Sequence, residues 1–166
     1  MKKELELNFK KGLSTLVDEI NLTKVKNKLM LPKSEEGEEW SYDKCDEAEI
    51  EYKRFLTLLK LYPEEKFVPN KLMDEMWHRH ILDTAGYRND CQKTFGIFID
   101  HYPYYGLNGK EDKSNLDKDF LKTKVLYQLT FGVEMDRESL AVRCGDDHAC
   151  HAESSCACRV STACKG

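Results

Sequence analysis

The stretch CDEAEIEYKRFLTLLKLYP, residues 45–63, decides the fold class. Its apolar side chains follow one another at steps of three or four residues, which is the spacing of one face of an α-helix. Pro63 ends the pattern, because proline has no backbone N–H to donate and does not continue a helix. The stretch therefore predicts an amphipathic helix, whose apolar face consists of Cys45, Ala48, Tyr52, Phe55, Leu59 and Tyr62.

The chain before this helix repeats the pattern over residues 13–29. Leucine, valine and isoleucine recur there at helical spacing on both sides of Asn21. The pattern predicts one helix, or two short helices broken near Asn21, and Pro32 stops it. The strongly acidic residues 34–49 read as a solvated loop that enters the next helix near Ser41.

A third helical pattern covers residues 73–95, where apolar side chains again step by three or four. Asp83 or Thr84 can cap a second helix there, so we expect a kink at that point. The spacing of three places Trp77 and His80 together on the buried face. Cysteines on helical stripes behave as small apolar residues, so we also assign Cys45 and Cys91 to the core.

The last helical pattern covers residues 114–131. Ser114 and Asp117 have the spacing of a capping box, and Gly132 is a natural C-terminal stop. Strand patterns are nearly absent from the sequence. We predict an all-α fold, a compact bundle of four to six helices. The domains are a helical domain at 1–132, a linker at 133–143 and a Cys/His-rich tail at 144–166, which is disordered or ordered by metal.

Composition excludes several classes of function. The chain has 166 residues and a net charge of −4, and no basic patch of the kind that binds nucleic acid. No apolar run approaches the length of a membrane span, and no secretory signal opens the chain. We therefore expect a cytoplasmic protein without a nucleic-acid or membrane partner. Thiols stay reduced in that compartment, so clustered cysteines indicate metal or redox chemistry.

The string DEMWHRHILDTAGY, residues 74–87, resembles the glycine-rich domain-containing protein-like family of bacteria and plants. The likeness extends over roughly residues 13–132 and includes the segments VKNKLM and EYKRFLTLLKLYP. It implies a helical domain and supports the fold more than the function. The family's glycine-rich tail has no counterpart here, because alanine and serine stand where most of the glycine would be.

The same string supplies candidate ligands. Asp74 and His78 share one helix face, His80 and Asp83 share another, and His101 can fold back to either pair. Three such ligands with a water would suit zinc or iron, and a metal-dependent enzyme that uses His78, His80 and His101 is one alternative. The structural interpretation, which we favour here, makes His80 a hydrogen-bonded core residue. It gives His78 a loop carbonyl as partner and places Asp74 in the first turn for the helix dipole.

The tail has a ligand-rich composition that needs a chemical explanation. Its side chains are too small and polar to bury enough area to order the segment. Thiolates and imidazoles bind Zn(II), and thiolates select Cu(I). We therefore expect a non-enzymatic protein that binds zinc or copper through the tail, with a metal-trafficking protein as partner. The predicted ligands are Cys144, His148, Cys150, His151, Cys156, Cys158 and Cys164.

The same letters permit a second hypothesis for the tail. Serine and threonine precede cysteine at distances suited to thioether rings, as in the core of an enzymatically modified peptide. The helical domain would then be a long leader, and the partner would be a tailoring enzyme. A third interpretation is an inert tail.

Overall fold

The computed structural model describes residues 16–135, which form helices joined by loops, with no strand among them. The helical elements are α2 (Thr23–Met30), η1 (Lys33–Glu35, a 3-10 turn), α3 (Tyr42–Leu61), α4 (Lys71–Leu82), α5 (Thr84–Phe95) and α6 (Gly109–Phe131). The prediction of an all-α fold is confirmed for this part of the chain. The predicted tail lies outside the described residues.

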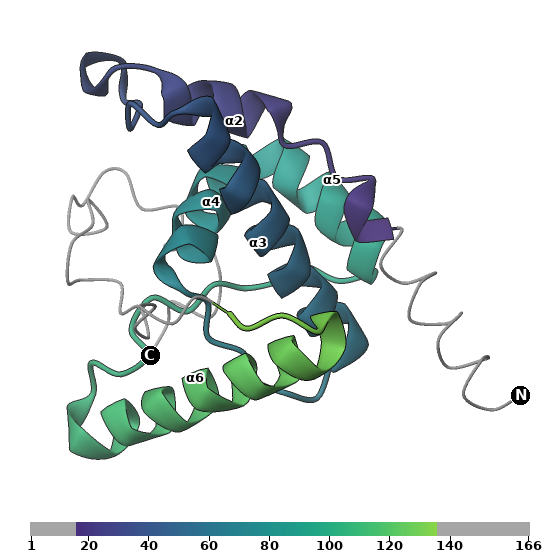
Figure 1. The fold of residues 1–166 in the computed structure, drawn as a ribbon, viewed down its shortest axis with the longest axis vertical. Helices are drawn as coiled ribbons and strands as arrows, with labels where there is room; N and C mark the ends of the chain where they lie inside the picture. Colours follow the sequence, from purple (N-terminus) through teal and green to yellow (C-terminus); the bar gives the residue numbers. More distant parts are fainter. Residues whose placement is uncertain (1–15, 136–166) are drawn as a thin grey trace, which may run out of the picture.

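Helix α3 is the central element, and it contacts α2, α4 and α6 (Figure 1). The side chain of Ser41 caps its start by accepting a hydrogen bond from Lys44 N, and the helix ends just before Pro63. Cys45, Ala48, Tyr52 and Phe55 are fully buried. The apolar face that the spacing predicts is therefore the face that packs.

Helices α4 and α5 follow each other directly, with only Asp83 between them. Asn70 accepts from Met73 N at the start of α4, and Asp83 accepts from Gly86 N at the start of α5. The predicted break at Asp83 is confirmed, because this side chain caps the second helix. Trp77 and His80 are both buried, as their spacing predicts.

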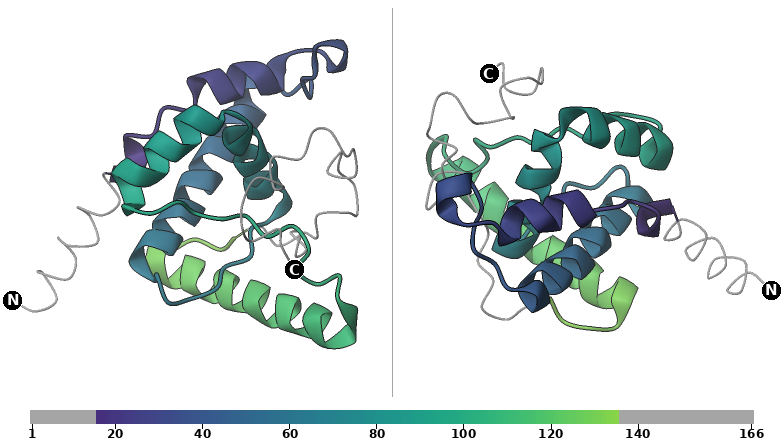
Figure 2. Two further views of the ribbon diagram at one scale, coloured as in Figure 1. Left: turned by 180° about the vertical axis from the view of Figure 1, so that it is seen from behind. Right: turned by 90° about the horizontal axis from the view of Figure 1, so that it is seen from above.

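Helix α6 lies along one end of the body, as the views in Figures 1 and 2 agree. It begins at Gly109, so the predicted start at Ser114 was wrong by more than a turn. The carboxylate of Asp112 accepts hydrogen bonds from the backbone N–H groups of Gly106 and Asn108 and so ties the preceding loop to the start of the helix. Gly132 ends the helix in the left-handed conformation, as predicted.

The remaining predictions concern the two ends of the body. The early pattern resolves into two helical pieces, because Glu19–Leu22 separate a helical turn at 16–18 from α2. Met135 lies in the predicted linker and is nevertheless buried, so the core extends past residue 132. No helix in the described range is both long and apolar enough to cross a membrane.

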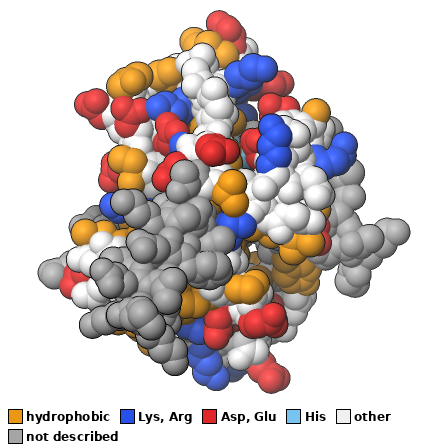
Figure 3. All heavy atoms as spheres, turned by 90° about the vertical axis from the view of Figure 1, so that its right-hand side faces the viewer, with side chains coloured by type: hydrophobic (Ala, Val, Ile, Leu, Met, Phe, Trp, Pro, Cys, Tyr) orange, Lys and Arg blue, Asp and Glu red, His pale blue; other side chains and the backbone are white. Residues whose placement is uncertain are grey.

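The surface in Figure 3 mixes acidic and basic side chains with scattered apolar ones. The described side chains on this face form no continuous basic patch. That agrees with the slightly acidic composition of the chain.

Candidate metal site

Helix α4 brings Asp74 and His78 together because the two residues are one turn apart on the same face. Asp74 lies in the first turn of the helix, where its negative charge is favourable for the helix dipole. His78 Nδ1 lies 3.5 Å from Asp74 Oδ2. The Asp74 side chain is 4% exposed and that of His78 is 15% exposed, so the pair lies just beneath the surface.

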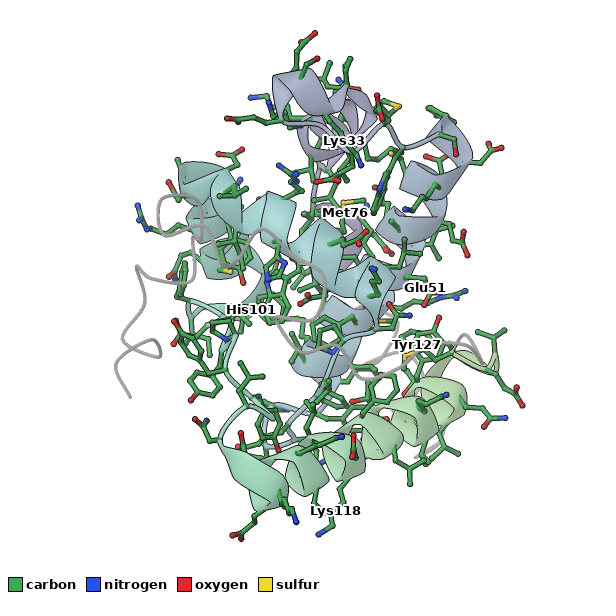
Figure 4. All side chains as sticks on the ribbon, turned by 90° about the vertical axis from the view of Figure 1, so that its left-hand side faces the viewer. Lys33, Glu51, Met76, His101, Lys118 and Tyr127 are labelled. Carbon is green, nitrogen blue, oxygen red and sulfur yellow. The ribbon has the colours of Figure 1, made fainter. Side chains whose placement is uncertain are left out.

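His101 reaches this pair from the loop between α5 and α6. The loop crosses the body beside α4, and the His101 side chain is labelled in Figure 4. His101 Nε2 lies 2.9 Å from Asp74 Oδ1, so the carboxylate accepts a hydrogen bond from the ring. The imidazoles of His78 and His101 have centroids 4.5 Å apart. Each of the two carboxylate oxygens therefore faces a different histidine.

We call these three residues the Asp–His–His cluster. One candidate ligand atom from each residue lies within 4.8 Å of those from the other two. Around a zinc ion with ligands at about 2.0–2.2 Å, tetrahedral neighbours are about 3.3–3.6 Å apart. The carboxylate–imidazole distances of 2.9 and 3.5 Å bracket most of that range. Each imidazole therefore lies at about the ligand spacing from one oxygen of the Asp74 carboxylate.

A network of aromatic contacts surrounds His101. The Trp77 ring meets the His101 ring edge to face, with centroids 4.6 Å apart. Trp77 Nε1 donates to the hydroxyl of Tyr87 at 2.9 Å, and that hydroxyl donates to the carbonyl of Ile99 at 2.7 Å. Burial raises the pKa of Tyr87, so its hydroxyl keeps its proton and remains a donor. Helices α4 and α5 are thereby joined to the loop just before His101.

His80 lies apart from the cluster, in what we call the His80 network. Its Nδ1 accepts from the hydroxyl of Tyr52 at 3.1 Å, and its Nε2 donates to Asp90 Oδ2, also at 3.1 Å. Both ring nitrogens are satisfied by a neutral imidazole in this arrangement. Burial lowers the pKa of His80, and Asp90 acts in the opposite direction. Burial also raises the pKa of Tyr52 well above its usual value, so that phenol stays protonated.

The structure sorts the candidate ligands predicted from the sequence. It brings Asp74, His78 and His101 together, and it places His80 in the core, so His80 is not a member of the cluster. Asp83 caps α5 instead of pairing with His80. The seven tail ligands, from Cys144 to Cys164, lie outside the described residues.

Sequence reasoning missed the partners that surround these histidines. Tyr52 and Asp90 complete the His80 network. The hydroxyl of Tyr87 bonds the loop at the carbonyl of Ile99. Tyr52 stands on a predicted apolar stripe, which indicates burial but not what its hydroxyl meets. Such cross-element hydrogen bonds have no local spacing signal.

Comparison with protein families assigns this region. The model of the UCP032817-like family matches residues 16–124, more than half of the chain. The chain belongs to the UCP032817-like family. Comparison with curated proteins and with solved structures found no match.

The resemblance to the glycine-rich domain-containing protein-like family was therefore wrong. The string that carried it combines buried residues such as Trp77 with the helix cap Asp83. Such a pattern marks two consecutive helices and does not identify a family. The UCP032817-like match includes Asp74, His78 and His101 and ends before the tail cysteines. The three residues of the Asp–His–His cluster thus lie within the part of this chain that matches the family.

Proposed function

We propose that the helical body is a metal-binding domain that holds a divalent transition-metal ion, zinc or iron, through Asp74, His78 and His101. The observation that supports it is the convergence of three ligand atoms within 4.8 Å of one another in a largely buried place. Two elements distant in sequence contribute to this convergence, a helix and a loop. Their meeting requires the tertiary fold.

The donor set favours this class of ion. Two imidazoles and one carboxylate are typical of zinc sites with an open position and of non-haem Fe(II) sites. Three protein ligands leave room for water or another small ligand. An ion held in this way polarises bound oxygen ligands and lowers the pKa of bound water. The protein's part is to supply the geometry and to keep the site mostly dry.

Asp74 has a further role in the metal-free protein. Its carboxylate faces both imidazoles and so holds their ring nitrogens close together. Binding requires both histidines to give up any proton at the coordinating nitrogen. Affinity should therefore fall as the pH is lowered and protons compete with the ion.

The test is a titration of the full chain with Zn(II) and with Co(II), whose visible absorption reports coordination. Tail thiols would also bind these ions, so the titration uses a tail-serine variant that carries Cys144→Ser, Cys150→Ser, Cys156→Ser, Cys158→Ser and Cys164→Ser. We expect one ion per chain in this variant and loss of that ion in Asp74→Asn. The matched control is His80→Gln, which changes a histidine two residues from His78 and should leave binding intact.

Two outcomes would count against the proposal. If the tail-serine variant takes up no ion, the cluster is a set of hydrogen-bonded contacts between α4 and the loop. Uptake that persists unchanged in Asp74→Asn would place the ion elsewhere.

The composition of the tail favours a second candidate function. Five cysteines and two histidines fall within residues 144–166, a density that suits a soft ion such as Cu(I) or Zn(II). Native mass spectrometry of the reduced chain with Cu(I) tests it, with the tail-serine variant as control. A metal-trafficking protein would be the expected partner.

Intact mass separates this candidate from the modified-peptide hypothesis. Chain purified from its native host should have its sequence mass after denaturation if the tail only binds metal. A lighter or heavier mass would instead indicate a tailoring enzyme as the partner.

A further inference from the structure

We infer that Tyr87 is a positioning residue of the metal site, since its hydroxyl fixes the loop that carries His101. This inference rests on the proposed metal-binding function. Tyr87 itself does not bind the ion in this proposal. The residue acts through the backbone of the loop and through the ring of Trp77.

The hydroxyl of Tyr87 joins three elements. It donates to the carbonyl of Ile99 in the loop and accepts from Trp77 Nε1 in α4, while Tyr87 itself belongs to α5. The two side chains are buried, since Tyr87 is 2% exposed and Trp77 is 6% exposed, and Ile99 is partly buried. Water is therefore excluded from the bond between Trp77 and Tyr87 and has limited access to the bond with Ile99.

The anchor lies close to the ligand that it holds. Ile99 precedes His101 by two residues, which is at most about 7 Å of extended chain. The Trp77 ring contacts the His101 ring directly, with centroids 4.6 Å apart. The Phe98 ring also packs edge to face on Tyr87, at 5.3 Å. The Tyr87 hydroxyl thus holds the backbone before His101 directly, through Ile99. It holds the His101 imidazole indirectly, through the ring of Trp77.

A loop ligand needs this support more than the helix ligands do. Asp74 and His78 are fixed by the hydrogen bonds of α4, but His101 depends on how its loop is held. Ordering a free loop at the moment of binding costs affinity, and a preorganised ligand avoids that cost. Loss of the Tyr87 hydroxyl should therefore weaken the contribution of His101 and leave the Asp74–His78 pair in place.

The experiment compares Tyr87→Phe with Tyr52→Phe, both in the full-length tail-serine variant titrated with Co(II). Each substitution removes one hydroxyl from a buried tyrosine, and the Tyr52 hydroxyl bonds His80 instead of the loop. We expect Co(II) affinity to fall by about 10- to 100-fold in Tyr87→Phe, the usual loss for an outer partner of a metal site. It should be unchanged in Tyr52→Phe.

A double-mutant cycle with His101→Ala separates positioning from a general loss of stability. If Tyr87 acts through His101, then Tyr87→Phe should cause no further loss of Co(II) affinity once His101 is alanine. Losses that add in the double variant would overturn the inference. So would equal losses in Tyr87→Phe and Tyr52→Phe.

A second readout needs no metal. Hydrogen exchange of the backbone amides in residues 97–102 should become faster in Tyr87→Phe and stay unchanged in Tyr52→Phe. If the tail-serine variant binds no ion but the loop exchanges faster, the metal proposal fails and the anchoring role stands. Unchanged exchange in Tyr87→Phe overturns the inference, whether or not the site binds Co(II).

Should Tyr87→Phe fail to fold, Trp77→Phe takes its place. It keeps an aromatic ring beside His101 and removes the N–H that bonds the Tyr87 hydroxyl, together with part of the indole ring. We expect a smaller loss of Co(II) affinity, and a smaller increase in the rate of hydrogen exchange in the loop, than those predicted for Tyr87→Phe. An affinity equal to that of the parent would contradict the inference.

Discussion

His78 and His80 lie two residues apart on α4 and end in different chemical surroundings. The backbone turns about 100° per residue, so their side chains leave the helix about 200° apart. His80 faces the core and meets Tyr52 and Asp90, whereas His78 meets Asp74 beside His101. Two histidines that are close in sequence thus contact different parts of the fold.

The comparison gives the reason for proposing a metal ion at His78 and not at His80. Both nitrogens of His80 are occupied by groups that suit a neutral ring, and the phenol of Tyr52 stays protonated because burial raises its pKa. His78 has a second imidazole and a carboxylate beside it, which are ligands in their own right. Both nitrogens of His80 are thus engaged in the His80 network, and we place the proposed ion at the Asp–His–His cluster.

The largest expected effect concerns Trp77, which borders the cluster. Its ring packs on Phe55 and His101, and its N–H bonds Tyr87, whose ring contacts His80. Trp77→Ala should lower the free energy of unfolding by about 3–5 kcal/mol, as large-to-small core changes do. Urea unfolding followed by circular dichroism measures it. A loss below about 1 kcal/mol would show that Trp77 is not a core residue.

The next effect distinguishes His78 from His80 by how much Zn(II) stabilises their variants. At a free Zn(II) concentration of one hundred times the dissociation constant, a site specific to the folded state adds about 2.7 kcal/mol to stability. We expect this increment in the tail-serine variant and in His80→Gln, and not in His78→Ala. Unfolding curves with and without Zn(II) measure it. The same increment in all three chains would remove the distinction drawn between the histidines.

The metal-free proteins should show the reverse order. His80→Ala leaves a cavity and removes the partner of Tyr52 and Asp90, so it should cost about 2 kcal/mol of stability. His78→Ala changes a side chain that is 15% exposed and lies just beneath the surface, and it should cost less than about 1 kcal/mol. Urea unfolding in the presence of a chelator measures both. A larger loss for His78→Ala would mean that the cluster stabilises the fold more than the network does.

The smallest effect is a dependence on pH. The pKa of His80 is lowered in the folded protein, chiefly by burial, so the unfolded chain binds a proton more readily. The stability due to neutral His80 is present above about pH 6.5, the unfolded value, and is lost as the pH falls towards the folded value. The slope of the free energy of unfolding against pH cannot exceed about 1.4 kcal/mol per pH unit for one proton. It should be reduced in His80→Gln, and an identical slope in both proteins would assign it to other groups.

Local rules predicted much of the body from the sequence. Ser41, Asp83 and Gly132 end or begin helices through contacts within a few residues, so their roles can be read from neighbouring letters. The rule failed at α6, where Ser114 looked like a cap. Asp112 instead bonds the backbone of the preceding loop, and the helix starts at Gly109. A cap formed with a loop is visible only when the path of that loop is known.

The sequence by itself determined that Asp74 and His78 share a face, because a spacing of four residues in a helix leaves no alternative. It also placed Trp77 and His80 in the core. Only the tertiary structure decided that His101 joins Asp74 and His78 and not His80 and Asp83. That choice depends on the path of the loop after α5, which is held by hydrogen bonds among Trp77, Tyr87 and Ile99. Contacts between residues this far apart carry no periodicity, so the fold must form before the cluster exists.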